Sequence, residues 1–223
     1  MSNEYRVEAR MVKGDWPALV TLLALFIAGA VLYPRLPESV PAHWNLQGEV
    51  DRYLSRFWGA FALPILAAVC YLGMLFVPYI DPKRENYARF PAAYRAMRIG
   101  LVLVLGVLQA LILSAGLGGP ANLVPRAVPL VIGGLFVVIG NYLPQARYNY
   151  FFGIRTPWTL ADEGVWRRTH RFAGVLFVLA GLAMAAAAFL RAPANGIIAL
   201  GAIVGAAAGS TLYSFLAFRR VRG

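Results

Sequence analysis

Six long stretches of almost uninterrupted hydrophobic residues divide this 223-residue chain, and the segments between them carry its charges. A helix needs about 20 largely apolar residues to cross a hydrocarbon core about 30 Å thick. Each stretch is close to that length, and none contains Asp, Glu, Lys, Arg or His. The pattern predicts an all-α integral membrane protein with six transmembrane helices, at Trp16–Tyr33, Phe57–Ile80, Ile99–Leu117, Ala127–Leu143, Phe172–Leu190 and Gly196–Phe218.

The composition favours lipid over water as the environment of these helices. Hydrophobic residues make up 60% of the chain and charged residues only 14%, whereas about a quarter of the residues in a soluble domain are charged. The net charge of +11 does not indicate direct nucleic-acid binding, because basic residues in so apolar a chain mark cytoplasmic loops and headgroup contacts. Cys70 is the only cysteine, so an intrachain disulfide cannot form.

The distribution of basic residues predicts the orientation of the chain in the membrane. Sixteen of the 21 Lys and Arg residues fall in the two tails and in the loops after the second and fourth stretches. Cytoplasmic loops are enriched in Lys and Arg, so we expect both termini to be cytoplasmic. The remaining five basic residues are expected on the other side of the membrane. They are Arg35, Arg52, Arg56, Arg126 and Arg191.

The last stretch contains two overlapping small-xxx-small steps, from Gly201 through Gly205 to Gly209. Small residues at such spacing let helix backbones approach closely inside a bilayer. The fifth stretch is also poor in bulky side chains, so we expect the fifth and sixth helices to form a tight pair. Packing within one chain is favoured over dimerisation.

The loop between the first two stretches is expected outside the cell and is long for a connection. Asn45 and Gly48 are residue types that favour turns, and His43, Asn45 and Asp51 have the chemistry to converge, with Asp51 accepting from the imidazole. Ser55 is placed to cap the second helix. This loop is either a small ordered lid that meets a ligand or a self-satisfied turn cluster, and composition alone favours the second interpretation.

The loop between the fourth and fifth stretches is expected in the cytoplasm. Thr159, followed three residues later by Asp162, resembles a capping box and predicts a helix that continues through Trp166 into the fifth stretch. Trp158, Trp166 and the nearby arginines are typical of a segment at the headgroup level. Alternatively, Arg155 and Thr156 beside Gly153 form a polar binding site for an acidic group.

Together the two loops resemble the SdpI family of bacterial membrane immunity and signalling proteins. The resemblance divides the chain into an N-terminal membrane half at 1–117 and an SdpI-like half at 118–223. The first loop is similar to a small membrane domain of unknown function that often precedes the family segment, in His43, Trp44, Asn45, Gly48 and Asp51. The second loop resembles the family signature in Asn149, Gly153, Arg155, Thr156, Pro157, Trp158, Thr159, Trp166, Thr169 and His170.

The resemblance implies a non-enzymatic protein of the bacterial cell (inner) membrane that protects a toxin-producing cell against its own secreted protein toxin. It further implies signalling, in which the toxin-engaged protein sequesters an ArsR-type autorepressor at the membrane. The expected partners are the lipid bilayer, a toxin outside and a repressor inside. No catalytic residue, cofactor or metal ligand is predicted.

Two other function classes stay open. A transporter of a lipid or apolar substrate is compatible with the six helices, but the absence of ionisable residues from the predicted spans argues against ion coupling. A membrane-embedded metal-dependent hydrolase is disfavoured because the only two histidines, His43 and His170, are expected on opposite sides of the membrane. No helical His/Glu zinc motif is present either.

Overall fold

The computed structural model describes residues 5–120 and 122–222, so residues 1–4, 121 and 223 of the predicted halves lie outside the described part. Six helices in this part are long and apolar enough to cross a membrane. They confirm the predicted spans in number and order. Their bounds are α2 (Trp16–Leu32), α3 (Arg56–Ile80), α5 (Pro91–Gly116), α6 (Leu123–Tyr142), α8 (Glu163–Ala187) and α9 (Ala194–Arg222).

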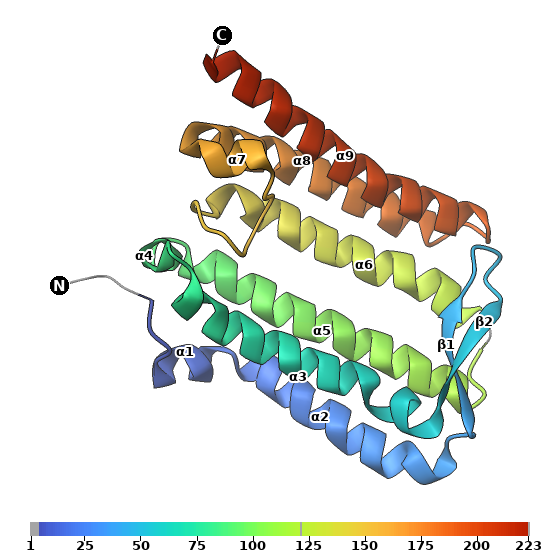
Figure 1. Ribbon diagram of the computed structural model, residues 1–223. Coiled ribbons are helices and arrows are strands. Elements are labelled where there is room, and N and C mark those ends of the chain that lie inside the picture. The colour runs from blue at the N-terminus through green and yellow to red at the C-terminus, as the bar shows by residue number, and fades with distance from the viewer. Residues whose placement is uncertain (1–4, 121, 223) are drawn as a thin grey trace.

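The long helices form two halves. In the first half α2 and α3 pack on α5, and in the second α6 and α9 pack on α8. Figure 1 shows a β-hairpin at one end, which we call the hairpin end, and both termini at the other, the terminal end. The short elements are α1 (Ala9–Gly14), η1 (Tyr33–Arg35), β1 (Ser39–Trp44), β2 (Val50–Ser55), α4 (Arg84–Tyr87), η2 (Leu143–Gln145) and α7 (Pro157–Ala161).

Two helices begin well before the predicted starts at Ile99 and Phe172. α5 begins at Pro91, whose fixed φ and missing N–H suit the first turn of a helix. α8 begins after Asp162, whose side chain accepts a hydrogen bond from the backbone of Val165 at 2.7 Å. The long helices therefore extend beyond the predicted spans and include charged residues there, while the predicted spans themselves contain no Asp, Glu, Lys, Arg or His.

A buried amide compensates for a proline inside α3. Pro64 has no N–H to donate to the carbonyl of Ala60 one turn earlier. The side chain of Gln109 on α5 is fully buried and donates to the carbonyls of Ala60 and Gly59 at 3.0 and 2.9 Å. An unsatisfied carbonyl inside a bilayer costs several kcal/mol, so this bond fastens α5 to α3 at Pro64.

The closest helix contact lies between α6 and α8. A Cβ built on Gly133 would approach the carbonyl oxygen of Gly181 to 2.6 Å, and one on Gly140 would approach that of Gly174 equally closely. By contrast, a Cβ on Gly201 or Gly205 would meet nothing within 4 Å. α8 and α9 do pack together, as predicted. Of the three glycines only Gly209 faces α8, where its Cβ would lie 2.9 Å from the side chain of Leu176.

The hairpin replaces the turn cluster expected between the first two helices. β1 and β2 pair antiparallel, from Ser39 opposite Ser55 to Trp44 opposite Val50. Val40 is fully buried, and its side chain lies where Cβ atoms on Gly59 and Gly116 would be. The space left by these two glycines of α3 and α5 thus accommodates Val40 at the base of the hairpin. Ser55 makes no side-chain cap bond to α3, so the predicted cap is wrong.

Candidate functional site

The tip of the hairpin is held by its own polar groups. The Asn45 side-chain oxygen accepts from the backbone N–H of Glu49 at 3.0 Å, and Gly48 turns the chain with a positive φ of 81°. His43 and Asp51 face each other, with 2.5 Å between Nδ1 and Oδ1. Of the three residues considered for convergence, the structure therefore joins His43 to Asp51, while Asn45 serves the turn.

The hydrogen bond from His43 also sets the charge of Asp51. It lowers the pKa of that carboxyl below its ordinary value, so the pair has a fixed negative partner at neutral pH. Both side chains are largely exposed, at 56% and 39%. An exposed pair of this kind contributes little to the stability of the fold. Because both side chains are exposed, a ligand can reach them.

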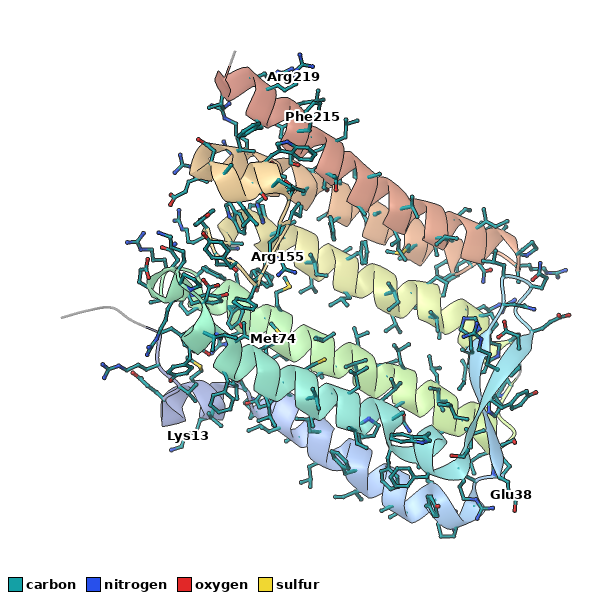
Figure 2. The ribbon with its side chains drawn as sticks, viewed as in Figure 1. Lys13, Glu38, Met74, Arg155, Phe215 and Arg219 are labelled. Carbon is teal, nitrogen blue, oxygen red and sulfur yellow. The ribbon has the colours of Figure 1, made fainter. Side chains whose placement is uncertain are left out.

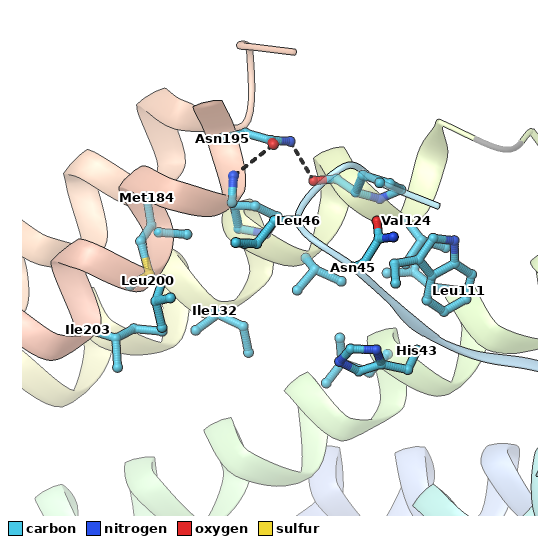
Figure 3. Close-up of a pocket in the computed structure, with 18 of the residues that line it drawn as sticks. His43, Asn45, Leu46, Leu111, Val124, Ile132, Met184, Asn195, Leu200 and Ile203 are labelled. Carbon is cyan, nitrogen blue, oxygen red and sulfur yellow. Dashed lines mark hydrogen bonds between the residues drawn. The ribbon is translucent and has the colours of Figure 1, made fainter. Parts of the chain in front are cut away.

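An apolar cavity of about 530 Å³ lies beneath the hairpin. Figure 3 shows His43 and Asn45 on the hairpin strand that runs past it, with Ile132, Leu200 and Met184 on the helices behind. Its walls come from the hairpin, α5, α6, α8 and α9. The cavity thus joins the two halves at the hairpin end. Four of the five predicted residues of this loop line it, namely His43, Trp44, Asn45 and Gly48.

The second predicted loop, at the terminal end, is organised around Asn149. This fully buried side chain accepts from the backbone N–H groups of Phe151 and Phe152 at 3.0 and 2.6 Å. It donates to the carbonyl of Arg147 at 2.8 Å. One amide therefore fixes the turn that carries the rest of the loop.

His170 holds the next part of the loop against α8. Its Nε2 accepts from the backbone N–H of Ile154 at 3.0 Å, which places the proton on Nδ1, where it is donated to the carbonyl of Trp166 at 2.8 Å. Gly153 has a φ of 100°, and a Cβ there would collide with the imidazole. Only glycine therefore fits at position 153 while His170 occupies its present place.

The turn before α8 differs from the predicted capping box. Thr156 caps α7, accepting from the N–H of Thr159 at 3.2 Å while the Thr159 hydroxyl accepts from the N–H of Thr156 at 2.9 Å. Thr156 also shares a hydrogen bond with Ser214 on α9 at 3.0 Å. Asp162 caps α8 separately. The box predicted from Thr159 to Asp162 is therefore wrong, because two consecutive helices begin here instead of one.

The remaining signature residues are mostly packing groups. Pro157 occupies the first turn of α7, and Trp158 packs against Phe215 with ring centroids 5.1 Å apart. Trp166 is fully buried, stacks on His170 and donates to the carbonyl of Ala146 at 2.9 Å. Thr169 is fully buried as well. These side chains therefore belong to a folded loop that is held by its own packing and hydrogen bonds.

Arg155, the charged residue of the signature, is not one of these packing groups. Its side chain is exposed and donates from Nη1 to the carbonyl of Tyr150 at 3.0 Å. Figure 2 shows it between the two halves, near the terminal end. The structure thus displays this guanidinium on a rigid loop, with donors left for a ligand.

The same loop reaches across to the first half through residues that the sequence did not single out. Asp81, at the end of α3, accepts from the Tyr87 hydroxyl at 2.8 Å and from the backbone N–H of Tyr150 at 2.9 Å. The same hydroxyl lies 3.2 Å from the Asn149 side-chain oxygen, a second acceptor within reach of its one proton. Asn86 donates to the carbonyl of Tyr148 at 2.7 Å. We call these residues the junction.

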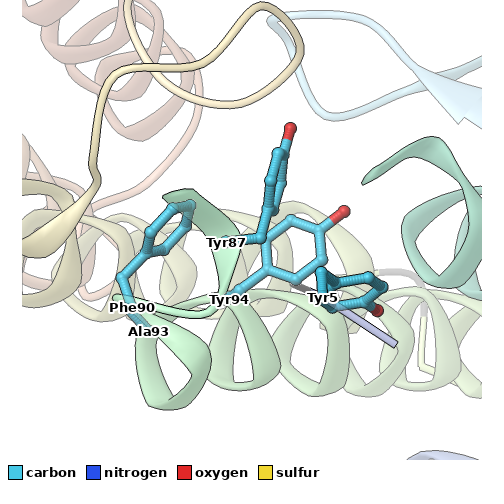
Figure 4. Close-up of a cluster of buried hydrophobic side chains, with 5 residues drawn as sticks. All are labelled: Tyr5, Tyr87, Phe90, Ala93 and Tyr94. Atoms are coloured by element: carbon cyan, nitrogen blue, oxygen red, sulfur yellow. The ribbon is translucent and has the colours of Figure 1, made fainter. Parts of the chain in front are cut away.

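The junction lies on a buried aromatic cluster. Figure 4 shows Tyr5, Tyr87, Phe90 and Tyr94 grouped with Ala93. Burial, together with the hydrogen bond to Asp81, raises the pKa of the Tyr87 hydroxyl far above its ordinary value, so it remains a donor at physiological pH. The terminal end is therefore joined by firm polar bonds, whereas the hairpin end is joined around a cavity.

A buried ion pair also lies within the first half. Arg98 on α5 and Asp15, which precedes α2, are 1% and 0% exposed. Nε and Nη2 of Arg98 lie 2.9 and 2.7 Å from Oδ2 of Asp15, and the Tyr71 hydroxyl donates to the same oxygen at 3.2 Å. Each of the two residues stands one position before a predicted span, so the pair lies at the ends of these spans and not inside them.

The structure separates the two histidines. His43 is in the hairpin, and His170 is on α8 beside the loop at the terminal end, so they cannot share a metal ion. Among residues 5–120 and 122–222, no three His, Cys, Asp or Glu side chains are grouped to hold one.

Comparisons with known proteins agree with the two-loop pattern. Residues 145–214 match the SdpI/YfhL protein family, and residues 20–68 match a domain of unknown function, DUF1648. The chain is 27% identical over 210 residues to the immunity protein SdpI of Bacillus subtilis (strain 168), covering 92% of this chain and 96% of that protein. No solved structure matches it.

Each match contains one of the two loops. The domain of unknown function includes the hairpin, and the SdpI/YfhL segment includes the turn from Asn149 to His170. The six spans and this relative also place the protein in the bacterial cell membrane as a multi-pass protein. The predicted resemblance is confirmed: residues 145–214 are similar to the SdpI/YfhL family, and residues 20–68 are similar to the domain of unknown function that precedes this segment.

Proposed function

We propose that this protein is a non-enzymatic immunity protein of the cell membrane, which protects its cell against a secreted protein toxin. The observation that carries the proposal is the similarity to an immunity protein along almost the whole chain, both loops included. Fold alone would not indicate a function, because one fold serves many. The two signature loops narrow it, since each builds a defined structure at one end of the bundle.

The orientation proposed with this function has the hairpin outside and the terminal end in the cytoplasm. Figure 2 shows Lys13 and Arg219 near the terminal end and Glu38 at the hairpin. Sixteen of the 21 basic residues belong to the tails and loops of the terminal end, as the positive-inside rule requires of a cytoplasmic face. The toxin then meets the hairpin, and an ArsR-type repressor meets the basic terminal end around Arg155.

Signalling between the two ends would use the relative position of the halves. The hairpin tip contacts the second half, because a Cβ on Gly48 would lie 3.3 Å from both Pro125 and Ala192. At the terminal end the junction, from Asp81 to Tyr150, joins the same halves. A toxin that fits one arrangement of the halves better than another shifts the equilibrium between them, and the loop carrying Arg155 moves with it.

The proposal is tested with the cell that makes the protein. A strain lacking the gene should be inhibited by the culture supernatant of its parent, and the restored wild-type chain should remove that inhibition. Arg155→Ala should restore growth incompletely or not at all, because the guanidinium has donors beyond the one bonded to the Tyr150 carbonyl, and these are displayed for a partner. Arg168→Ala is the matched control, an exposed arginine at the same end, and should restore growth fully.

The contrary result is equally clear. If the parental supernatant affects the strain with and without the gene to the same degree, protection against a secreted toxin is not the function. If the gene protects but Arg155→Ala protects as well as the wild type, the role of Arg155 is excluded. Protein levels in the membrane fraction, measured by immunoblot, separate loss of function from loss of the protein.

Transport of a lipid or apolar substrate is the second candidate, and the apolar cavity beneath the hairpin favours it. An apolar cavity of this size is typical of small-molecule sites. A transporter would move the cavity's occupant from one leaflet to the other, whereas an immunity protein would not. Flipping of a fluorescent lipid in vesicles that contain the purified protein distinguishes the two.

A further inference from the structure

The cavity beneath the hairpin lies at the depth of a single lipid leaflet. Along α9 it extends from Asn195 to Ile203, a rise of about 12 Å at 1.5 Å per residue. Half of a hydrocarbon core is about 15 Å thick. Its walls on the helices are almost entirely apolar, with Leu111, Ile132 and Leu200 among them. The cavity therefore matches an acyl chain of one leaflet in polarity and depth.

A second hollow, of about 350 Å³, adjoins this cavity at the ends of the helices. The two share Gly48, Pro125 and Asn195 in their walls. The second hollow is lined by Arg126 in the first turn of α6 and by Arg191 in the turn between α8 and α9. Helix ends of membrane proteins lie at the headgroup level, so the charged hollow borders headgroups and the apolar one borders acyl chains.

The two arginines are available to an anion. Both are exposed, and within residues 5–120 and 122–222 neither forms an ion pair. The wall between the hollows is firm, because buried Asn195 donates to the carbonyl of Pro125 at 2.8 Å and accepts from the backbone N–H of Gly196 at 2.7 Å. Figure 3 shows both bonds. Two guanidinium groups over an apolar cavity have the charge pattern that complements an anionic amphiphile.

We propose that the two hollows form one binding site for an anionic phospholipid, with an acyl chain beneath the hairpin and the phosphate between Arg126 and Arg191. The bilayer around the helices supplies this ligand at high concentration, whereas a toxin segment would have to enter from water. The lipid lies against Gly48 and Asn45, so it supports the hairpin from below. This site does not depend on the proposed immunity function.

Native mass spectrometry of the purified full chain tests the proposal with two lipids of matched acyl chains, phosphatidylglycerol and phosphatidylcholine. We expect the wild type to retain phosphatidylglycerol preferentially. Arg126→Gln combined with Arg191→Gln should weaken its binding about tenfold and remove the preference. Arg35→Gln combined with Arg52→Gln removes the same charge at the same end and should leave the preference intact.

Occupation of the cavity is tested separately by adding bulk. Ala199→Phe places a ring in the cavity wall and should displace the acyl chain, lowering retention of phosphatidylglycerol about tenfold. Ala208→Phe adds the same ring at an exposed position of α9 outside the cavity and should have no effect. A thermal melt of each variant shows that the fold is kept.

Two results would overturn the proposal. One is equal retention of the two lipids by the wild type, or equal loss in the site and control variants. The other is unchanged lipid binding in the site variants together with loss of protection in cells, which would assign the cavity to the toxin. If protection fails in the gene-deletion experiment but the lipid preference follows the variants, only the immunity function is excluded.

Discussion

Arg98→Met should lower the free energy of unfolding by about 3–5 kcal/mol, because it leaves the buried carboxylate of Asp15 without its partner. Both side chains are at most 1% exposed, so water cannot replace the lost contact. Two nitrogens of Arg98 lie within 2.9 Å of the same oxygen. Unfolding in mixed micelles of detergent and dodecyl sulfate, followed by circular dichroism, measures the change.

The double variant Asp15→Leu with Arg98→Met separates charge pairing from packing. Replacing both partners of a buried pair by apolar groups is often nearly neutral, so the double variant should be more stable than Arg98→Met alone. Arg95→Met is the control on the same helix, with an exposed side chain, and should change stability by less than about 0.5 kcal/mol. Equal effects of Arg98→Met and Arg95→Met would show that Arg98 and Asp15 do not form a buried pair inside the protein.

Gly133→Ala should lower the free energy of unfolding by about 1–3 kcal/mol, because the added methyl would overlap the backbone of α8. A Cβ there lies 2.6 Å from the carbonyl oxygen of Gly181 and 3.1 Å from the backbone nitrogen of Ala185. Backbone atoms cannot move aside as a flexible side chain can, so the two helices must separate. The same micelle titration gives the result.

The next residue of α6 provides the matched control. A Cβ on Gly134 meets nothing within 4 Å, so Gly134→Ala should raise stability by up to about 1 kcal/mol through helix propensity alone. Opposite signs at adjacent positions would locate the tight contact between α6 and α8. If both substitutions stabilise the protein, the close approach of these helices is wrong.

The six spans could be predicted from the sequence because each of them depends on local composition. Length and hydropathy decide whether a helix crosses a bilayer, and both can be read from a single stretch of chain. The ends of the helices depend on tertiary contacts. Arg98 and Asp15 stand one residue outside predicted spans, and their charge indicated loops until the structure paired them across helices.

The two loops could also be recognised from local signals in the sequence. Their internal structure could not be predicted in this way. Turn residues such as Gly48 and Gly153 are local signals. The pairing of Gly153 with His170, the contact of Tyr87 with Asn149 and the cavity beneath the hairpin each join segments that are distant in sequence. Two of the α9 glycines also show that a small-xxx-small pattern does not by itself mark a helix contact.

The proposed function requires that the hairpin and the loop around Arg155 lie on opposite sides of the membrane, with the hairpin outside. Single cysteines at Gln47 and Ala161, both exposed, in a chain with Cys70→Ser, test this by labelling with a membrane-impermeant maleimide. We expect labelling of Gln47→Cys in intact cells and of Ala161→Cys only after permeabilisation. Labelling of Ala161→Cys in intact cells, with Gln47→Cys protected, would contradict it.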